Sequence, residues 1–484
     1  MLFNSIDFAI FLPIVFFLYW FVVNKNLKIQ NIFLLIVSYI FYGWWDWRFL
    51  FLIVFSTCVD YFVGLQISKT DNKQKRKGLL GISLLVNLGL LGFFKYYNFF
   101  IDSFTESFTF LGYSIQPYRL SIILPVGISF YTFQTLSYTI DVYNKKLTPT
   151  KNFINFAAFV TFFPQLVAGP IERATHLLPQ FFKARVFEYS KAVDGLKLIL
   201  WGLFTKIVVA DNCAIVVNDI FENYTDYSGS TLLFGAVFFA FQIYGDFSGY
   251  SSIAIGVSKL FGFDLMQNFA TPYFSRDIAE FWRRWHISLT TWFRDYLYIP
   301  LGGSRGGTGM KIRNTFVIFL VSGFWHGANW TFVFWGALNA LYFLPLLLSG
   351  KNRKNTNTVA EGRLLPGFKE AFQIIFTFFL TVIAWVFFRS ETISKAVDFL
   401  KRMFADLISN INYENLRASY YTVFYIVILL IIEWINREHK HTLEVFLNKK
   451  TTWLRWSFYL IITILVLNSF FKAGDNQDFI YFQF

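Results

Sequence analysis

The stretch TFVIFLVSGFWHGANWTFVFWGALNALYFLPLLL occupies residues 315–348 and contains no Asp, Glu, Lys or Arg. A helix needs roughly 17 to 25 mainly apolar residues to cross the hydrocarbon core of a bilayer. Apolar runs near or above this length, once flanking polar residues are included, recur at residues 8–23, 32–45, 49–67, 79–94, 198–210, 232–243, 372–388, 420–434 and 458–471. The sequence therefore predicts an all-α integral membrane protein, because helices satisfy their own backbone hydrogen bonds in lipid.

The composition leads to the same class. Of the 484 residues, 55% are hydrophobic, 22% aromatic and only 15% charged, whereas soluble domains are charged at about a quarter of their positions. No Lys or Arg precedes the first run, 8–23, and no small-residue cleavage site follows it, so we expect a retained span rather than a signal peptide. No internal repeat or Pro/Ser-rich linker is visible. We predict about eleven transmembrane helices in a single polytopic domain covering residues 1–484.

The formal net charge of +13 is concentrated in certain connections between the apolar runs. The basic connections are residues 69–77, 144–151, 351–355 and 436–441, and the neutral or acidic ones are residues 44–48, 101–108 and 219–229. Because Lys and Arg gather in cytoplasmic loops, this alternation predicts basic loops in the cytoplasm and an N-terminus outside. Nucleic-acid binding is not expected, since its basic residues would cluster on one soluble face.

Two segments combine spanning length with residues that break helices. They are PVGISFYTFQTLSYTIDVY at residues 125–143 and FVTFFPQLVAGPIER at residues 159–173, which includes Pro164 and Pro170. Non-helical backbone at membrane depth persists only where protein or a watery cavity covers it. We therefore expect a re-entrant segment that lines an internal cavity.

The segment FWRRWHISLTTWFRDYLY, residues 281–298, has a different pattern. Wound as one helix, it places aromatic rings and His286 on one side and basic side chains, Arg283, Arg284 and Arg294, on the other. A helix of this kind lies in the membrane interface rather than across the bilayer. Its basic residues place it on the cytoplasmic side.

A glycine-rich turn, LGGSRGGTG at residues 301–309, follows Pro300, which we expect to end the interfacial helix. The turn contributes a further basic side chain, Arg305. It lacks the Lys-Ser/Thr ending and the strand-to-helix context of a phosphate-binding loop, so nucleotide binding of that kind is not expected.

Two histidines lie in apolar surroundings, and each allows two interpretations. His326 is either a buried ring bonded to a backbone carbonyl or to Asn329, or an ionisable group that lines a pathway or reaction site. Small residues beside it, among them Gly323 and Gly327, let backbones or a ligand approach closely. His286 either completes the aromatic face of its helix or points toward whatever His326 faces. The residues alone leave these alternatives open.

Other site chemistries are disfavoured. Cys58 and Cys213 are the two cysteines of the chain, and the histidines lack thiols or carboxylates at ligand spacing, so no metal site is expected. No G-x-S-x-G elbow is present, which argues against a Ser-His-Asp triad. What remains is a histidine that acts as general base on a hydroxyl, or as a transient nucleophile, in a cavity that excludes water.

Several motifs of the chain resemble those of the membrane-bound O-acyltransferase family. They are MLFNSIDFAIFLPIVFFLYW, ILPVGISFYTFQTLSYTIDVY, FFPQLVAGPIER, FQIYGDFSGYSSIAIG, FWRRWHISLTTWFRDYLYIPLGGSR and SGFWHGANWTFVFWGALNAL. The chain is most similar to the bacterial branch that contains the alginate O-acetyltransferase membrane subunit, peptidoglycan O-acetylating proteins and, more distantly, the teichoic-acid D-alanyl transferase. This resemblance covers most of the chain, and the last two motifs are highly specific.

The resemblance implies a ring of transmembrane helices around a central tunnel that joins a cytoplasmic donor side to an extracytoplasmic acceptor side. It also implies that His326 is the catalytic histidine and that His286 orients or assists it. One position departs from close relatives, because Ser252 stands in YSSIAIG where an acidic residue is expected. Asp246 is then the only acid of that motif.

Together, the residues and the resemblance predict an O-acyltransferase that moves an acetyl group from a cytoplasmic thioester for O-acetylation of a cell-surface polysaccharide, such as alginate or another exopolysaccharide. We expect no tightly bound cofactor, with acetyl-CoA or an acyl-carrier thioester as the donor. Arg283, Arg284, Arg294 and Arg305 are the residues expected to meet the donor's phosphates or the acidic surface of a carrier protein.

The expected partners are an extracytoplasmic SGNH-hydrolase-like acetyltransferase, the polysaccharide acceptor and, if the donor is carrier-bound, an acyl carrier protein. We expect the protein to lie in the lipid bilayer of a bacterial cytoplasmic membrane. Two alternatives keep the chemistry and change the donor or acceptor: D-alanyl transfer to teichoic acid and O-acetylation of peptidoglycan. A third alternative, from another class, is a transporter in which His326 and buried Arg and Asp residues form a proton relay.

Overall fold

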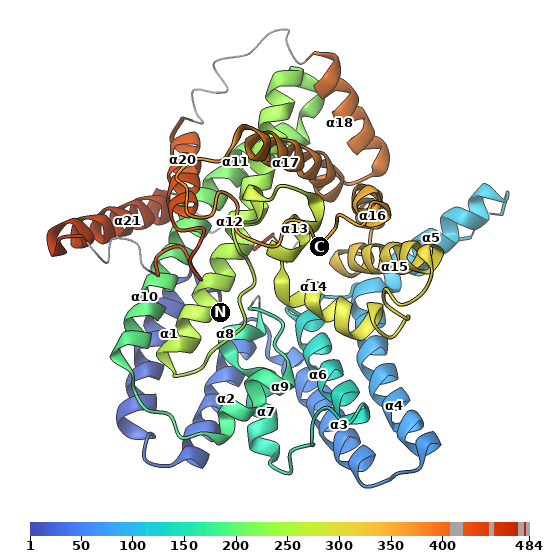
Figure 1. The fold of residues 1–484 in the computed structure, drawn as a ribbon. Coiled ribbons are helices and arrows are strands. Elements are labelled where there is room, and N and C mark those ends of the chain that lie inside the picture. Colours follow the sequence, from blue (N-terminus) through green and yellow to red (C-terminus); the bar gives the residue numbers. More distant parts are fainter. Residues whose placement is uncertain (114, 168, 407–419, 445–449, 473–478, 481–484) are drawn as a thin grey trace. The chain divides into compact units, whose positions relative to one another are not determined.

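The computed structural model describes residues 1–113, 115–167, 169–406, 420–444, 450–472 and 479–480. Every regular element in these residues is a helix, which confirms the predicted all-α class (Figure 1). The chain divides into two compact units, one of Met1–Ala192 and Ser258–Met266 and the other of Val193–Val257 and Gln267–Phe484. The predicted single domain over residues 1–484 stays a prediction.

Helices that could cross a membrane are found in both units. Seven helical stretches of the described residues are long and apolar enough: Trp47–Ser68, Lys73–Phe110, Tyr189–Glu222, Gly229–Leu260, Trp330–Leu348, Phe368–Arg389 and Thr452–Lys472. Three shorter apolar helices are Ile6–Val22, Leu27–Gly43 and Tyr420–Ile435. A multi-pass membrane protein is thereby confirmed, while the number of about eleven spans stays a prediction.

The first unit is built from short and long helices in chain order. They are α1 (Ile6–Phe17), α2 (Leu27–Gly43), α3 (Leu50–Ser68), α4 (Lys73–Leu91), α5 (Tyr97–Phe110), α6 (Ile128–Tyr143), α7 (Phe153–Thr161), α8 (Phe163–Leu166) and α9 (Ala174–Leu177). Single π-helical turns at Leu18–Val22 and Gly92–Tyr96 continue α1 and join α4 to α5, and 3₁₀ turns lie at Trp47–Phe49 and Leu178–Phe182.

A buried polar cluster joins α3, α4 and α6. The carboxylate of Asp60 accepts hydrogen bonds from Ser83, from Asn87 at 2.9 Å and from Thr139 at 3.1 Å. A buried charge without such donors would be costly, so the three helices are held in the one register that supplies them.

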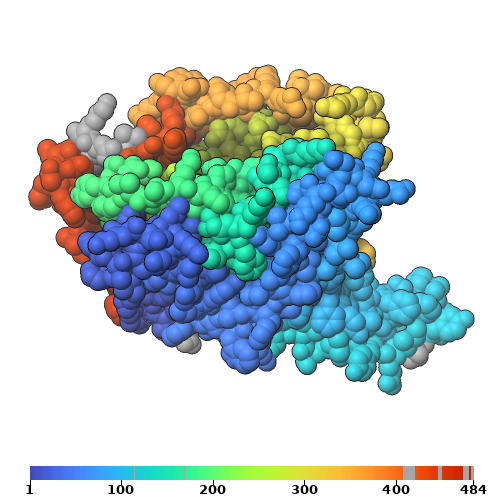
Figure 2. Space-filling model, turned by 90° about the horizontal axis from the view of Figure 1, so that it is seen from below, coloured from blue at the N-terminus to red at the C-terminus, as the bar shows by residue number. Residues whose placement is uncertain are grey.

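The helix α5 differs from its neighbours in packing. It projects from the rest of the first unit (Figure 1, Figure 2), and none of its residues is buried. Phe100, Phe104 and Phe110 on this helix are all more than half exposed. Lipid tails are as apolar as these side chains, so the surface of α5 needs no protein partner in a bilayer.

The segment expected to be re-entrant, residues 159–173, is interrupted as predicted. α7 ends at Thr161, the four-residue α8 follows, and α9 begins only at Ala174. Ala168 lies outside the described residues. Glu172, which is fully buried, accepts a hydrogen bond from the N–H of Met266 and thereby fixes this non-helical backbone within the first unit. The role of the segment in lining a cavity stays a prediction.

The second unit carries the remaining helices. They are α10 (Tyr189–Leu203), which begins in the first unit, α11 (Asp211–Glu222), α12 (Gly229–Leu260), α13 (Ile278–Arg284), α14 (Ile287–Phe293), α15 (Thr308–His326), α16 (Trp330–Leu348), α17 (Phe368–Arg389), α18 (Ile393–Ala405), α20 (Tyr420–Ile435) and α21 (Thr452–Lys472). A π-helical turn at Phe204–Ala210 joins α10 to α11, another at Arg294–Tyr298 continues α14, and 3₁₀ turns lie at Tyr224–Asp226 and Pro272–Phe274.

The prediction of one continuous helix over residues 281–298 is wrong. α13 ends at Arg284 and α14 begins at Ile287, and between them His286 has a left-handed φ of 44°, which L-residues rarely adopt. The physical reason is that the N–H of Ile287 donates to the carbonyl of Asn268 instead of continuing the helical ladder. The sequence pattern could not show this competing acceptor, because it lies outside the segment.

Candidate functional site

His326 is the last residue of α15, and residues 327–329 connect it to α16. Its side chain is buried, with 3% of the residue exposed. The ring lies edge-on to Trp335 of α16 and Phe388 of α17, at centroid distances of 5.2 and 5.4 Å. Aromatic walls from two helices therefore displace water from around this imidazole.

Two glycines bring α15 and α16 close enough to hold His326 between these walls. A Cβ atom at Gly323 would overlap the carbonyl oxygen of Phe332, and one at Gly336 would overlap the carbonyl oxygen of Phe319. Each of these glycines thus admits the backbone of the opposite helix, as the small residues around His326 predicted. The close pairing fixes the end of α15 against α16.

Replacing Gly323 with alanine is expected to destabilise the protein by about 1–3 kcal/mol, because the added methyl group must push α16 away. Gly309, in the first turn of the same helix, has no atom within 4 Å of an added Cβ. Gly309→Ala is therefore the matched control and should be neutral or slightly stabilising. Thermal unfolding of the two variants in detergent measures the difference; equal stability would show that the helices do not pack this closely.

His286 lies in the same unit as His326 and faces it. The centroids of the two imidazole rings are 6.4 Å apart. His286 is 1% exposed, and the ring of Phe247 on α12 packs against it edge-on at 4.5 Å. The second interpretation of His286, in which it points toward the surroundings of His326, is therefore the one that the geometry supports.

The burial of His286 gives the protein a pH-dependent stability. Desolvation lowers the pKa of His286 from 6.5 to about 3. Between these values the unfolded chain binds a proton that the folded protein does not, so the stability from neutral His286 is complete above pH 6.5 and falls as the pH drops. Relative to a His286→Asn variant, the wild type should lose about 2 kcal/mol by pH 5. Unfolding of both proteins in detergent between pH 7 and 5 checks this; equal acid sensitivity would contradict it.

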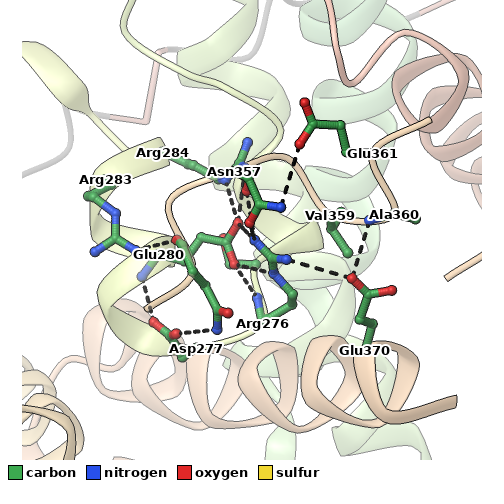
Figure 3. Close-up of polar contacts among 12 residues, drawn as sticks. Arg276, Asp277, Glu280, Arg283, Arg284, Asn357, Val359, Ala360, Glu361 and Glu370 are labelled. Carbon is green, nitrogen blue, oxygen red and sulfur yellow. Dashed lines mark hydrogen bonds and ion pairs between the residues drawn. The ribbon is translucent and has the colours of Figure 1, made fainter. Parts of the chain in front are cut away.

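Arg283 and Arg284 are engaged with a polar loop of the second unit (Figure 3). The guanidinium of Arg283 donates to the carbonyls of Asn352 and Asn355, at 2.8 and 2.6 Å. Arg284 donates to the carboxylate of Glu280 at 3.1 Å and contacts the same loop further along. Both arginines therefore tie the loop to α13. Their expected role in donor binding stays a prediction.

Arg276 is the centre of this network, and the sequence did not single it out. It donates to Glu280 at 3.0 Å and to the carbonyl of Asn357 at 2.6 Å, and it lies 3.6 Å from a carboxylate oxygen of Glu370 on α17 (Figure 3). The side chain is 6% exposed. An Arg just before the N-cap of a short helix gives no recognisable signal, because its partners Asn357 and Glu370 come from distant parts of the chain.

The other two predicted basic residues are on the surface. Arg294 pairs with its neighbour Asp295 at 2.7 Å, and more than half of its side chain is exposed. Arg305 lies exposed in the glycine-rich turn. Their guanidinium groups thus remain accessible to a ligand in solvent, in contrast to that of Arg276.

Two further histidines have structural partners. The ring of His176 lies 2.7 Å from a carboxylate oxygen of Glu172, and this hydrogen bond raises the pKa of His176. The ring of His441 lies 2.8 Å from a carboxylate oxygen of Asp194 and is mostly buried. His439 is exposed.

The comparison with known families identifies the family of the chain. Residues 147–388 match the sequence profile of the membrane-bound O-acyltransferase family. This region spans half of the chain and contains both buried histidines and all four predicted arginines. The chain belongs to the membrane-bound O-acyltransferase family. The resemblance drawn from the RRWH and WHG motifs is confirmed.

Individual relatives extend the similarity over the whole length of this membrane-bound O-acyltransferase. The chain is 37% identical over 511 aligned positions to a probable alginate O-acetylase of Pseudomonas putida, with full coverage of both chains. It is 41% identical to the corresponding protein of Pseudomonas aeruginosa, over 86% of this chain and 78% of the relative. It is also 32% identical to a peptidoglycan O-acetyltransferase of Helicobacter pylori, over 100% of this chain and 98% of the relative.

Asp246, the remaining acid of the YGDFSGYSS motif, has a charged partner in this O-acyltransferase. It pairs with the ammonium of Lys206, which also lies 2.9 Å from Asp211, and it accepts a hydrogen bond from the N–H of Ile480. All three charged side chains are less than 10% exposed. The motif therefore supplies one acid of a buried ion-pair cluster.

Metal chemistry has no ligand cluster in the part of the chain that the structure describes. No group of three or more His, Cys, Asp or Glu side chains lies there in a position to hold an ion. The two central histidines are surrounded instead by aromatic rings. Imidazole side chains in such surroundings can act as general acids, general bases or nucleophiles.

Proposed function

We propose that this membrane-bound O-acyltransferase moves acetyl groups from a cytoplasmic thioester donor to the hydroxyl groups of a cell-surface polysaccharide. The observation that carries the proposal is the pair of buried imidazoles, His286 and His326, with ring centroids 6.4 Å apart among aromatic side chains. The names of the relatives support the reaction, because several at 37–42% identity are probable alginate O-acetylases.

Within this proposal His326 acts as the general base. It takes the proton of the acceptor hydroxyl as the oxygen attacks the thioester carbonyl; a C–O bond forms, the C–S bond breaks, and the proton passes to the departing sulfur. His286 orients the reacting groups from the opposite side. The aromatic walls keep water away, which matters because water would otherwise compete with the hydroxyl for the acyl group.

The donor is proposed to be acetyl-CoA and to approach from the cytoplasm. Arg294 and Arg305 have exposed guanidinium groups, which suit the phosphates of a nucleotide donor or the acidic surface of a carrier protein. Arg283, which is also exposed, and Arg284 lie in the same segment as Arg294, residues 281–298. The basic loops favour an orientation with the N-terminus outside in a bacterial cytoplasmic membrane.

A tunnel through the protein and a separate SGNH-hydrolase-like partner complete the proposal. Crossing the membrane with an acyl group requires a path from the donor side to the acceptor side, with the two histidines along it. In this arrangement the acceptor hydroxyl at His326 belongs to the secreted partner, which then passes the acyl group to a hydroxyl of the polysaccharide.

The donor is tested with the purified protein in proteoliposomes. Labelled acetyl-CoA and a D-alanyl-loaded carrier protein are supplied in separate reactions, each with the polysaccharide acceptor, and label in alkali-labile ester on the acceptor is measured. We expect ester from acetyl-CoA alone. If ester forms only from the D-alanyl carrier, the protein is a D-alanyl transferase rather than an acetyltransferase. Solute flux without ester would favour a proton-coupled transporter.

Peptidoglycan is a second acceptor candidate, because a peptidoglycan O-acetyltransferase is 32% identical over the full length of the chain. Exopolysaccharide and peptidoglycan can be separated by extraction, so acetylation of each can be measured independently. Cells that express the protein are divided into exopolysaccharide and peptidoglycan fractions, and ester-linked acetate is released from each by mild alkali. Acetate that depends on the protein and appears only in the exopolysaccharide supports the first acceptor.

A further inference from the structure

The segment that precedes α13 is hydrogen-bonded to the chain on both sides of His286. The N–H of Ala270 donates to the carbonyl of Arg284 at 3.0 Å, and the N–H of Ile287 donates to the carbonyl of Asn268 at 2.9 Å. Trp285 and His286 therefore lie in a short bend whose two ends are fixed to residues 268–270. This is the bend that interrupts the predicted helix.

The side chain of Asn268 adds a second layer of contacts to the same bend. Asn268 is fully buried, and its Oδ1 accepts from the backbone N–H and the hydroxyl of Ser288, at 3.3 and 3.0 Å. Ser288 lies in the first turn of α14, where backbone N–H groups have no partner within the helix. Asn268 thus caps α14 from a different segment of the chain.

The same amide reaches back to α12. Its Nδ2 donates to the hydroxyl of Ser251 at 3.1 Å. One turn earlier on α12, on the same helical face, Phe247 packs against the ring of His286 at 4.5 Å. Asn268 therefore links α12, whose Phe247 contacts His286, to α14, which begins directly after His286.

The left-handed backbone of His286 makes these contacts necessary. Its φ of 44° is unfavourable for a residue with a side chain, so surrounding bonds must hold it. Trp285 has an extended backbone as well, so a continuous helix would require both residues to become helical, which would change the direction of the His286 imidazole.

We propose that Asn268 is a positioning residue that sets the orientation of the His286 imidazole toward His326 through its bonds to Ile287, Ser288 and Ser251. The activity test of this role rests on the proposed acyl transfer. A second, spectroscopic test does not depend on which reaction the protein catalyses.

The activity test is a double-mutant cycle in proteoliposomes with labelled acetyl-CoA. Asn268→Ala should lower kcat by roughly 100-fold with a much smaller change in KM, since misplacing a reacting group by about 1 Å has such an effect. In a His286→Ala background the same substitution should cause no further loss, because there is no ring left to position.

The matched control is Asn436→Ala, which removes another buried amide that donates to a backbone carbonyl at 2.9 Å. Any loss from this variant should be the same in the wild-type and His286→Ala backgrounds. If Asn268→Ala lowers kcat by the same factor in the wild-type and His286→Ala backgrounds, the positioning role is overturned. The proposed function would remain intact in that case. Absence of ester from the wild type would instead overturn the proposed function.

Ser288→Ala serves if Asn268→Ala does not fold. It removes one hydroxyl that donates to Asn268 and keeps the backbone bond, so kcat should fall roughly threefold, and only when His286 is present. An unchanged kcat for a folded Ser288→Ala variant would count against the proposal.

A spectroscopic readout is independent of acyl transfer. The protein has five histidines, and the ring signals of His286 in histidine-labelled protein are assigned by their loss in His286→Ala. Asn268→Ala or Ser288→Ala should shift these signals far more than those of His176, and Asn436→Ala should leave them in place. Unchanged His286 signals in both test variants would overturn the proposal.

Discussion

Replacing His326 with alanine is expected to lower the rate of ester formation by about 10²- to 10⁴-fold. The residue closes α15 with its ring against Trp335 and Phe388, and it lies opposite His286. If His326 takes the proton of the acceptor hydroxyl, its removal leaves the hydroxyl a poor nucleophile in a site from which water is largely excluded. The measurement is ester-linked acetate on extracted surface glycans, and ester formed in proteoliposomes.

The alternative explanation of such a loss is a collapse of the packing. Alanine leaves a space among the aromatic rings, so the companion variant is His326→Phe, which fills that space with a ring that cannot accept a proton. We expect it to be as inactive as His326→Ala while its thermal unfolding stays close to that of the wild type. His439→Ala, at an exposed histidine, should retain full activity.

Retention of acetylation by a normally expressed His326→Phe variant would show that His326 is a packing residue, the first of the two interpretations that the sequence allowed. A partial loss, accompanied by a matching loss of folded protein, would lead to the same conclusion. A loss of activity with unchanged folding identifies the imidazole itself as the required group.

The sequence predicted the parts of this protein whose signal is local. Runs of apolar residues gave the membrane class, because burial in lipid acts on each span separately. The small residues beside His326 predicted a close helix approach, which Gly323 and Gly336 provide. The interruption near Pro164 was likewise visible, since proline acts on its own turn of backbone.

Features that depend on distant partners were missed. The helix over residues 281–298 was predicted as continuous because its amphipathic pattern is sound, but Asn268, outside that segment, supplies the acceptor that breaks it. Arg283 and Arg284 also bind a loop some 70 residues away, a contact that the sequence did not predict, while their expected role in donor binding stays a prediction. Patterns of charge and polarity do not reveal such partners.

Replacing Lys206 with methionine is expected to lower the free energy of unfolding by about 3–5 kcal/mol, the usual effect of breaking a buried ion pair by removing one partner. The side chain of Lys206 is 1% exposed, and its ammonium lies 2.9 Å from Asp211 and in contact with Asp246. The π-helical turn Phe204–Ala210 carries it to these two acids. Two buried carboxylates would remain without a counter-charge. Unfolding in detergent with increasing denaturant measures the loss.

The control separates loss of the charge partner from loss of the side chain. Neutralising both acids as well, in Lys206→Met/Asp211→Asn/Asp246→Asn, should recover most of the stability, because a neutral cluster of similar volume avoids the unpaired charges. Acetyl transfer per folded molecule should then remain near the wild-type level. A triple variant that folds well but forms no ester would instead place the charges of this cluster in the reaction, as the proton-relay alternative requires.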